Sequence, residues 1–160
     1  MNSKPQKEHE WLQKLVGEWT YEGDATMALG KPSERVTGTE SVRSLGGLWV
    51  LCEGHGEMPG GGEAIMIITL GYDPVKTRYI GSFIGSMMTQ MWIYEGELDS
   101  AAKVLTLNTE GPSFTDEGVM TKYRDVIEIK SDDHRVWSSS YLGDNKEWYV
   151  FMIANYRRIK

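Results

Sequence analysis

The fold is decided within residues 11–27, which read WLQKLVGEWTYEGDATM. In the first part of this stretch the apolar residues recur at helical spacing and form one stripe: Trp11, Leu12, Leu15 and Val16. From Gly17 onward the hydrophobic period changes to two, as in a strand with one buried face. The predicted inward face of that strand, over 17–27, carries Trp19, Tyr21, Gly23, Ala25 and Met27.

The helix that precedes this strand is predicted over 5–15. Ser3 is the expected N-cap, because Gln6 follows it by three residues in a capping-box pattern. His9 is expected on the polar face of the helix. A ten-residue helix is marginal in water, so packing must hold it. We therefore expect Trp11, Leu12 and Leu15 to plug one end of the domain.

Almost everything after Gly17 has the composition of strands bounded by turn residues. The predicted strands are 17–27, 34–43, 47–57, 63–73, 77–86, 90–99, 103–110, 119–130, 134–143 and 146–157. Their starts recur every 12 to 17 residues, which leaves no room for crossover helices. Parallel pairing is therefore excluded, and sequential antiparallel hairpins remain.

An antiparallel sheet of this size must protect two edges, and closure into a barrel removes both. The sequence therefore predicts an all-β fold, a ten-stranded antiparallel up-and-down β-barrel with the short N-terminal helix capping one end. A sandwich is the competing fold, but it usually needs longer Greek-key connections. We expect one domain over 1–160, with the barrel over about 17–158. A barrel of more than eight strands is wide enough for an internal cavity.

Composition limits the partners. The chain has 160 residues, with 17 Lys and Arg against 23 Asp and Glu, for a net charge of −6. This balance argues against nucleic acid and an anionic membrane surface as partners. The polar N-terminus shows no signal peptide and the single Cys forms no internal disulfide, so we expect a cytoplasmic protein. The longest uncharged run, 79–94, is too short and too polar to span a bilayer.

Alternation predicts which side chains face inward on three further strands. For 63–73 the inward set is Ala64, Met66, Ile68, Leu70 and Tyr72; for 90–99 it is Trp92, Tyr94, Gly96 and Leu98; for 146–157 it is Trp148, Val150, Met152, Ala154 and Tyr156. Strand 47–57 is ambiguous, since two apolar sets compete for its interior: Leu48, Val50 and Cys52, or Trp49, Leu51 and Glu53.

Few residues suggest chemistry. Glu53, His55 and Glu57 share one strand face and could bind a metal or form an acid–base pair, or they could be a solvated face. A metal site needs further ligands that the sequence does not supply, so no metal or cofactor is expected. Cys52 is expected to be a small buried hydrophobe, and His134 to be exposed in its turn.

The sequence offers one candidate for a buried acid. Glu40 shares a strand face with Val36 and Val42, and a buried carboxylate needs a partner. By residue type the best candidate partner is Arg124, although both side chains could instead point outward. Motifs for a nucleophile elbow, a phosphate-binding loop or a dinucleotide fold are absent from the sequence.

Gly17-Glu18-Trp19 opens the first strand after a short helix, and the last strand ends in Tyr156-Arg157-Arg158. This arrangement resembles the calycins, the lipocalins and their relatives. The resemblance implies that Trp19 packs against Arg157 or Arg158 and closes one barrel end. Nitrobindin-like haem barrels are a more distant resemblance, but they use a His near the C-terminus, and 148–158 contains none.

A closer resemblance covers almost the whole chain. Its motifs are Glu8-His9-Glu10-Trp11-Leu12, Leu15-Val16-Gly17-Glu18-Trp19, Ser44-Leu45-Gly46-Gly47-Leu48-Trp49, Gly71-Tyr72-Asp73-Pro74, Gly85-Ser86-Met87-Met88, Gly111-Pro112-Ser113 and Tyr123-Arg124-Asp125. In these motifs the chain resembles the bacterial domain of unknown function 1579 family, a lipocalin-like group. The resemblance implies a fold and leaves the activity open.

The functional hypothesis is a barrel that binds a small hydrophobic or amphipathic molecule. The expected contact residues are Trp49, Glu53, His55, Met66, Trp92, Arg124 and Met152. Two alternatives remain: a filled barrel with a structural or interaction role, and an enzyme that uses polar residues in the cavity, which is the less favoured. A homo-oligomer is compatible with the sequence.

Overall fold

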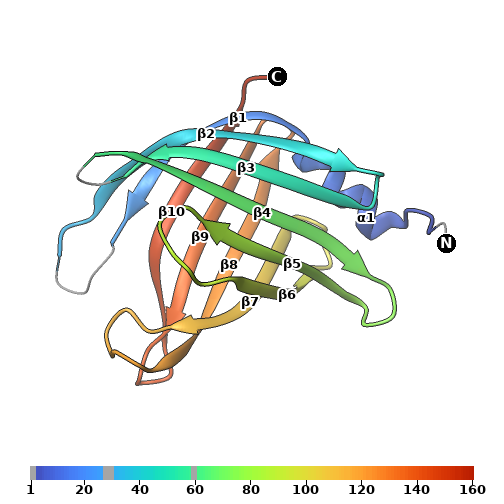
Figure 1. The fold of residues 1–160 in the computed structure, drawn as a ribbon. Helices are drawn as coiled ribbons and strands as arrows, with labels where there is room; N and C mark the ends of the chain where they lie inside the picture. The colour runs from blue at the N-terminus through green and yellow to red at the C-terminus, as the bar shows by residue number, and fades with distance from the viewer. Residues whose placement is uncertain (1–2, 27–30, 59–60) are drawn as a thin grey trace.

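The computed structural model describes residues 3–26, 31–58 and 61–160, and in them the chain forms a closed antiparallel β-barrel (Figure 1). Each strand pairs with the next in the chain, and the first pairs with the last. The ten strands are β1 (Gly17–Ala25), β2 (Glu34–Leu45), β3 (Trp49–Glu57), β4 (Glu63–Asp73), β5 (Arg78–Gly85), β6 (Trp92–Leu98), β7 (Val104–Pro112), β8 (Met120–Ser131), β9 (His134–Leu142) and β10 (Trp148–Arg158). The predicted up-and-down barrel is confirmed.

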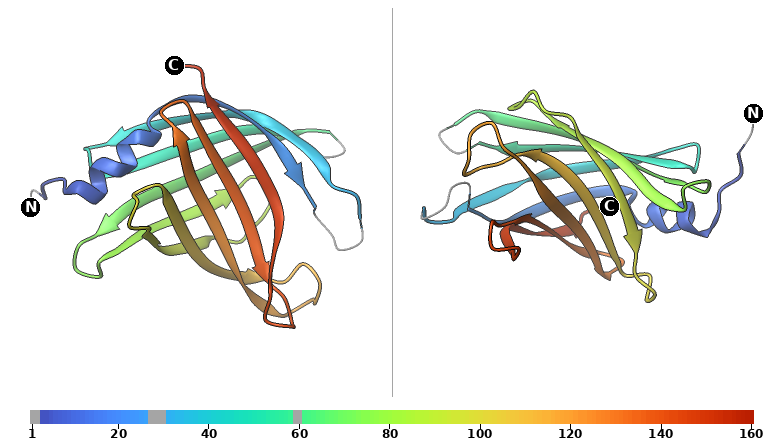
Figure 2. Two further views of the ribbon diagram at one scale, coloured as in Figure 1. Left: turned by 180° about the vertical axis from the view of Figure 1, so that it is seen from behind. Right: turned by 90° about the horizontal axis from the view of Figure 1, so that it is seen from below.

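The helix is shorter than predicted. Helix α1 spans Lys7–Leu12 and continues as a 3-10 turn, η1, over Gln13–Leu15. It lies against β3 and β4 at one end of the barrel (Figure 2), with Trp11, Leu12 and Leu15 buried as expected. None of the helices in the described part of the chain has the length and apolar character that a bilayer crossing requires.

Two expectations for the helix are wrong, and both errors have one cause. The N-cap is Gln6 instead of Ser3, and His9 is buried instead of facing solvent. The backbone N–H of Gln6 donates to Nδ1 of His9, and Nε2 of His9 lies 3.0 Å from the carbonyl oxygen of Tyr72. The imidazole thus caps the helix and also fastens it to β4, a tertiary role that overrides the amphipathic pattern.

Trp19 and the C-terminal arginine close the same end of the barrel. Trp19 and Arg158 are direct cross-strand neighbours, and the Arg158 guanidinium lies 4.2 Å from the centre of the Trp19 ring, which is 1% exposed. Arg158 also donates to the carbonyl oxygens of Lys14 and Val16, which ties η1 to the barrel. Of the two expected arginines, Arg158 makes the stack, while Arg157 is exposed on the outer face.

The ambiguity of β3 is resolved in favour of Val50 and Cys52, which are buried, while Trp49 points outward. Gly56 follows on the same inner face. A Cβ atom added there would lie 2.3 Å from the hydroxyl oxygen of Tyr21, so the bare backbone makes room for that phenol.

Alternation predicts the inner faces of β1, β4 and β6 correctly as far as they are described; Met27 lies outside the described residues. It fails in β10, where a register shift between Val150 and Met152 marks a β-bulge. Because of the extra residue, the inward and outward positions are exchanged in the part of β10 that precedes the bulge. Val150 is therefore 57% exposed and Trp148 lies against Arg124, whereas Phe151 faces the interior. The predicted inward positions of Trp148 and Val150 are wrong.

Candidate ligand-binding cavity

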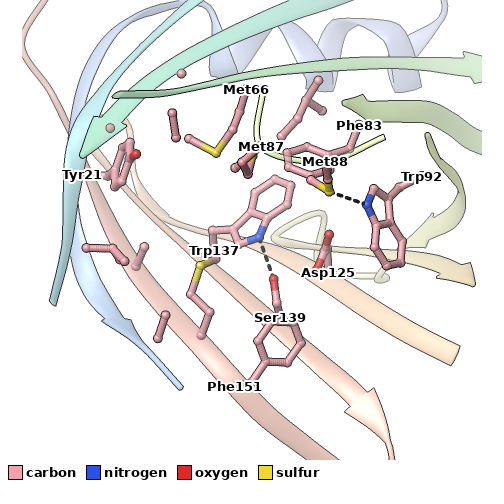
Figure 3. Close-up of a pocket in the computed structure, with 18 of the residues that line it drawn as sticks. Tyr21, Met66, Phe83, Met87, Met88, Trp92, Asp125, Trp137, Ser139 and Phe151 are labelled. Atoms are coloured by element: carbon pink, nitrogen blue, oxygen red, sulfur yellow. Dashed lines mark hydrogen bonds between the residues drawn. The ribbon is translucent and has the colours of Figure 1, made fainter. Parts of the chain in front are cut away.

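The barrel contains a cavity of about 460 Å³ (Figure 3). Methionine and aromatic side chains form most of its wall. Near the mouth, at the ends of β3 and β10 and in the β5–β6 and β7–β8 connections, the lining residues are Met58, Met87, Met88, Phe114 and Phe151. Met87 is 43% and Phe114 is 45% exposed, so apolar surface continues from the cavity to the solvent.

Three of the predicted contact residues lie on the cavity wall: Met66, Trp92 and Met152. Trp92 packs edge-to-face against Tyr123, with ring centres 5.0 Å apart. Its indole N–H points at the sulfur of Met88, 3.2 Å away. Its six-membered ring lies over Gly111, where an added Cβ would come within 2.0 Å of it. The indole is therefore held from three sides.

A belt of polar side chains crosses the inner wall over β6, β7, β8 and β9. We call it the polar belt, and it consists of Tyr94, Thr109, Asp125 and Ser139. Asp125 and Ser139 are paired across β8 and β9. On the opposite edge of β8, strand β7 pairs Leu107 with Asp125 and Thr109 with Tyr123. Thr109 is therefore a diagonal neighbour of Asp125.

Hydroxyl groups of the polar belt lie beside Asp125. The Tyr94 hydroxyl donates to its carboxylate, and the Ser139 hydroxyl lies beside it across the β8–β9 ladder. The indole N–H of Trp137 donates in turn to Oγ of Ser139 at 3.1 Å. Burial raises the pKa of Asp125, an effect that these two hydroxyl groups oppose. Burial, and then the charge of Asp125, raise the pKa of Tyr94, so this phenol stays a donor.

The cavity floor holds an ion pair. Arg135 donates to the carboxylate of Glu40, and the two side chains are 2% and 6% exposed. The Arg135 guanidinium also lies 4.1 Å from the ring centre of Tyr156 and 4.7 Å from that of Trp19. Burial, and then the charge of Glu40, raise the pKa of Tyr156. Of the two positions that the sequence leaves open for Glu40, the structure shows the interior one, and the partner of Glu40 is Arg135.

The predicted pairing of Glu40 with Arg124 is therefore wrong. Arg124 lies between two inward residues of β8, Tyr123 and Asp125, so its own side chain points outward. There its guanidinium stacks on Trp148, 3.8 Å from the ring centre. Arg124 is not a cavity residue.

Three more predicted contact residues lie outside the cavity because they occupy the outer face of β3. Trp49 covers Gly71. His55 lies between two carboxylates, with Nε2 2.8 Å from Glu53 and Nδ1 2.7 Å from Glu63. Both hydrogen bonds raise the pKa of His55. Over residues 3–26, 31–58 and 61–160 no cluster of three His, Cys, Asp or Glu side chains has the geometry of a metal site.

The model of one protein family, described as a protein of unknown function (DUF1579), matches residues 4–158. The chain belongs to the DUF1579 family. No curated protein is similar enough in sequence to match it.

Solved structures share the fold of this DUF1579 chain at low sequence identity. Rv2717c from M. tuberculosis aligns with a TM-score of 0.63 and 11% identity, over 98% of this chain and 100% of that one. The S-type phycobiliprotein lyase CPES from Guillardia theta aligns with a TM-score of 0.58 and 12% identity, over 98% and 99%. A redesigned beta barrel aligns with a TM-score of 0.50 and 8% identity, over 99% and 100%. These similarities show the fold alone.

Sequence reasoning missed the polar belt and the floor arginine of this DUF1579 protein, although local signals were present. Asp125 alternates with Tyr123 and Ile127, which are both buried. Arg135 alternates with Trp137 in the same way. A charged residue in phase with large apolar neighbours is a signal for a buried charge.

Proposed function

We propose that this protein binds a small, largely apolar molecule inside the barrel. The observation that carries the proposal is the cavity, because its volume of about 460 Å³ falls in the range of roughly 300–1,000 Å³ that is typical of ligand sites. Apolar walls with a few polar groups are also typical of such sites. A filled structural barrel would leave no space of this size.

The side chains around the mouth suit ligands of varied shape. Met58, Met87 and Met88 are unbranched and polarisable, and such side chains adapt to irregular apolar surfaces. Deeper in the cavity Met66, Trp92 and Met152 would contact the apolar body of the ligand. Trp137 adds a second indole to the wall. Two tryptophans at the site give the protein an intrinsic signal for binding.

We also propose that the protein works in the cytoplasm. Its one cysteine, Cys52, is buried, and burial raises the pKa of the thiol well above its ordinary value. A protein built with an inert thiol and no disulfide suits a reducing compartment.

The test is tryptophan fluorescence during titration with terpenoids, fatty acids and haem. We expect saturable quenching with at least one of these ligand classes, and a smaller change with Trp92→Phe. Trp49→Phe is the matched control, because it removes an indole from the outer face and should leave the ligand-induced change as it is. Absence of saturable quenching by every ligand in this panel, together with no binding of the ligands tested in the next subsection, would refute the proposal.

A further inference from the structure

The charges along the cavity all have one sign. The described residues that line it include Glu34, Glu40, Glu57 and Asp125, and none of them is Lys, Arg or His. Glu34 and Glu57 are exposed at the mouth, where water screens them. Glu40 is paired with Arg135 on the floor. Asp125 is a half-buried carboxylate that faces the cavity, and no cation among the described residues contacts it.

The polar belt also offers a ligand more hydrogen-bond acceptors than donors. The Tyr94 hydroxyl already donates its proton to Asp125, and Ser139 is the cross-strand neighbour of Asp125. A carboxylate can accept about four hydrogen bonds, so Asp125 keeps accepting capacity. Beside it, Thr109 lines the cavity and is only 7% exposed, and its Oγ1 has no hydrogen-bond partner. A buried hydroxyl without a partner is costly, and a ligand can remove that cost.

We infer that the polar belt recognises the protonated amine of an apolar ligand, and that the cavity rejects the carboxylate of a fatty acid. This inference rests on the proposed function and adds the ligand class to it. The ammonium group would donate to Asp125 and Thr109 while its apolar body lies among Met66, Trp92 and Met152. A fatty-acid carboxylate would meet acceptors and a like charge at the same place, and Arg135 is already engaged by Glu40. The affinity for a neutral alcohol should be intermediate between the affinities for the amine and the carboxylate.

A matched series of three ligands tests the inference on the unaltered protein. Dodecylamine, dodecanol and dodecanoate share one chain and differ in the head group. Their affinities are measured by titration calorimetry at pH 7, below the critical micelle concentrations of the amine and the carboxylate and below the solubility limit of the alcohol. We expect the amine to bind about tenfold or more tightly than dodecanoate, the change in affinity that one charge-assisted hydrogen bond produces. The alcohol should have an intermediate affinity.

The Asp125→Asn variant tests whether Asp125 causes the preference for the amine over dodecanoate. The amide has the shape of the carboxylate and keeps an oxygen that can accept from Tyr94, so circular dichroism should report an intact barrel. We expect the advantage of the amine over dodecanoate to fall at least fivefold. Glu110→Gln is the control, because it removes one negative charge from an exposed position of β7 that does not line the cavity, and it should change that ratio less than twofold.

The possible outcomes separate the two proposals. If none of the three ligands binds, and the panel described above also fails, the proposed function is refuted. If dodecanoate binds as tightly as the amine or more tightly, the proposed function stands and this inference is overturned. An unchanged preference in a folded Asp125→Asn variant also overturns it. Should that variant not fold, the ranking on the unaltered protein decides, with Thr109→Val expected to weaken binding of the amine.

Discussion

Arg135→Met should be among the most destabilising single substitutions in this barrel. It removes the guanidinium but keeps an unbranched side chain, and it leaves the Glu40 carboxylate buried at 6% exposure without its cation. Breaking a buried ion pair in this way costs about 3–5 kcal/mol. The loss of the stacks on Tyr156 and Trp19 acts in the same direction. For a chain of this length each kcal/mol lowers Tm by about 2–4 °C, so a fall of about 6–20 °C is expected.

The double variant Glu40→Met/Arg135→Met separates the charge effect from the loss of packing. With both charges gone no uncompensated carboxylate remains, and replacing a buried pair by apolar residues is often close to neutral. We therefore expect the double variant to be more stable than Arg135→Met alone. Urea unfolding followed by circular dichroism gives both free energies of unfolding, with equal slopes as the check on two-state behaviour. A cost below about 1 kcal/mol for Arg135→Met, or strictly additive costs, would contradict this reasoning.

Three further predictions concern the closed end and the outer face. Trp19→Ala should lower the free energy of unfolding by about 3–5 kcal/mol, because its ring is 1% exposed; a loss below 1 kcal/mol in urea melts would contradict the stacked closure. Deleting residues 1–15 should lower Tm and raise the binding of an apolar dye, since the helix covers the barrel end; unchanged values would show that it is dispensable. The raised pKa of His55 means that its two ion pairs stabilise the fold below the unfolded-state pKa of about 6.5 and lose that effect as the pH rises through the folded-state pKa. An NMR titration should therefore place the pKa of His55 above 6.5, and lower in Glu53→Gln; a value at or below 6.5 would show that the carboxylates do not act on the ring.

The strands were predictable because their signals are local. Alternation over 17–25 and 63–73 places each inward side chain without knowledge of any other strand. The same rule fails in β10, where the bulge at Phe151 changes the phase of the pattern. It is indecisive in β3, where both faces carry apolar residues as far as Cys52. Local patterns therefore predict the fold well and the orientation of individual side chains less well.

The candidate site was less predictable because it depends on which strands face one another across the barrel. Glu40 and Arg135 are 95 residues apart, and β1 and β10 lie between their strands in the sheet. Their contact follows from the closure and curvature of the sheet, which residue type alone does not encode. Arg124 was the wrong partner because its phase in β8 is opposite to that of Asp125.

The two carboxylates inside the barrel, Glu40 and Asp125, differ in what balances them. Glu40 has a guanidinium supplied by the chain itself, so its charge is compensated before any ligand arrives. Asp125 has only neutral hydroxyl groups beside it, those of Tyr94 and Ser139, and they leave its charge uncompensated. A charge that is partly removed from water and lacks a cation is unfavourable, so a ligand that brings one gains binding energy at Asp125 that it cannot gain at Glu40. Substitutions at the floor should therefore change stability, whereas substitutions in the polar belt should change which ligand is bound.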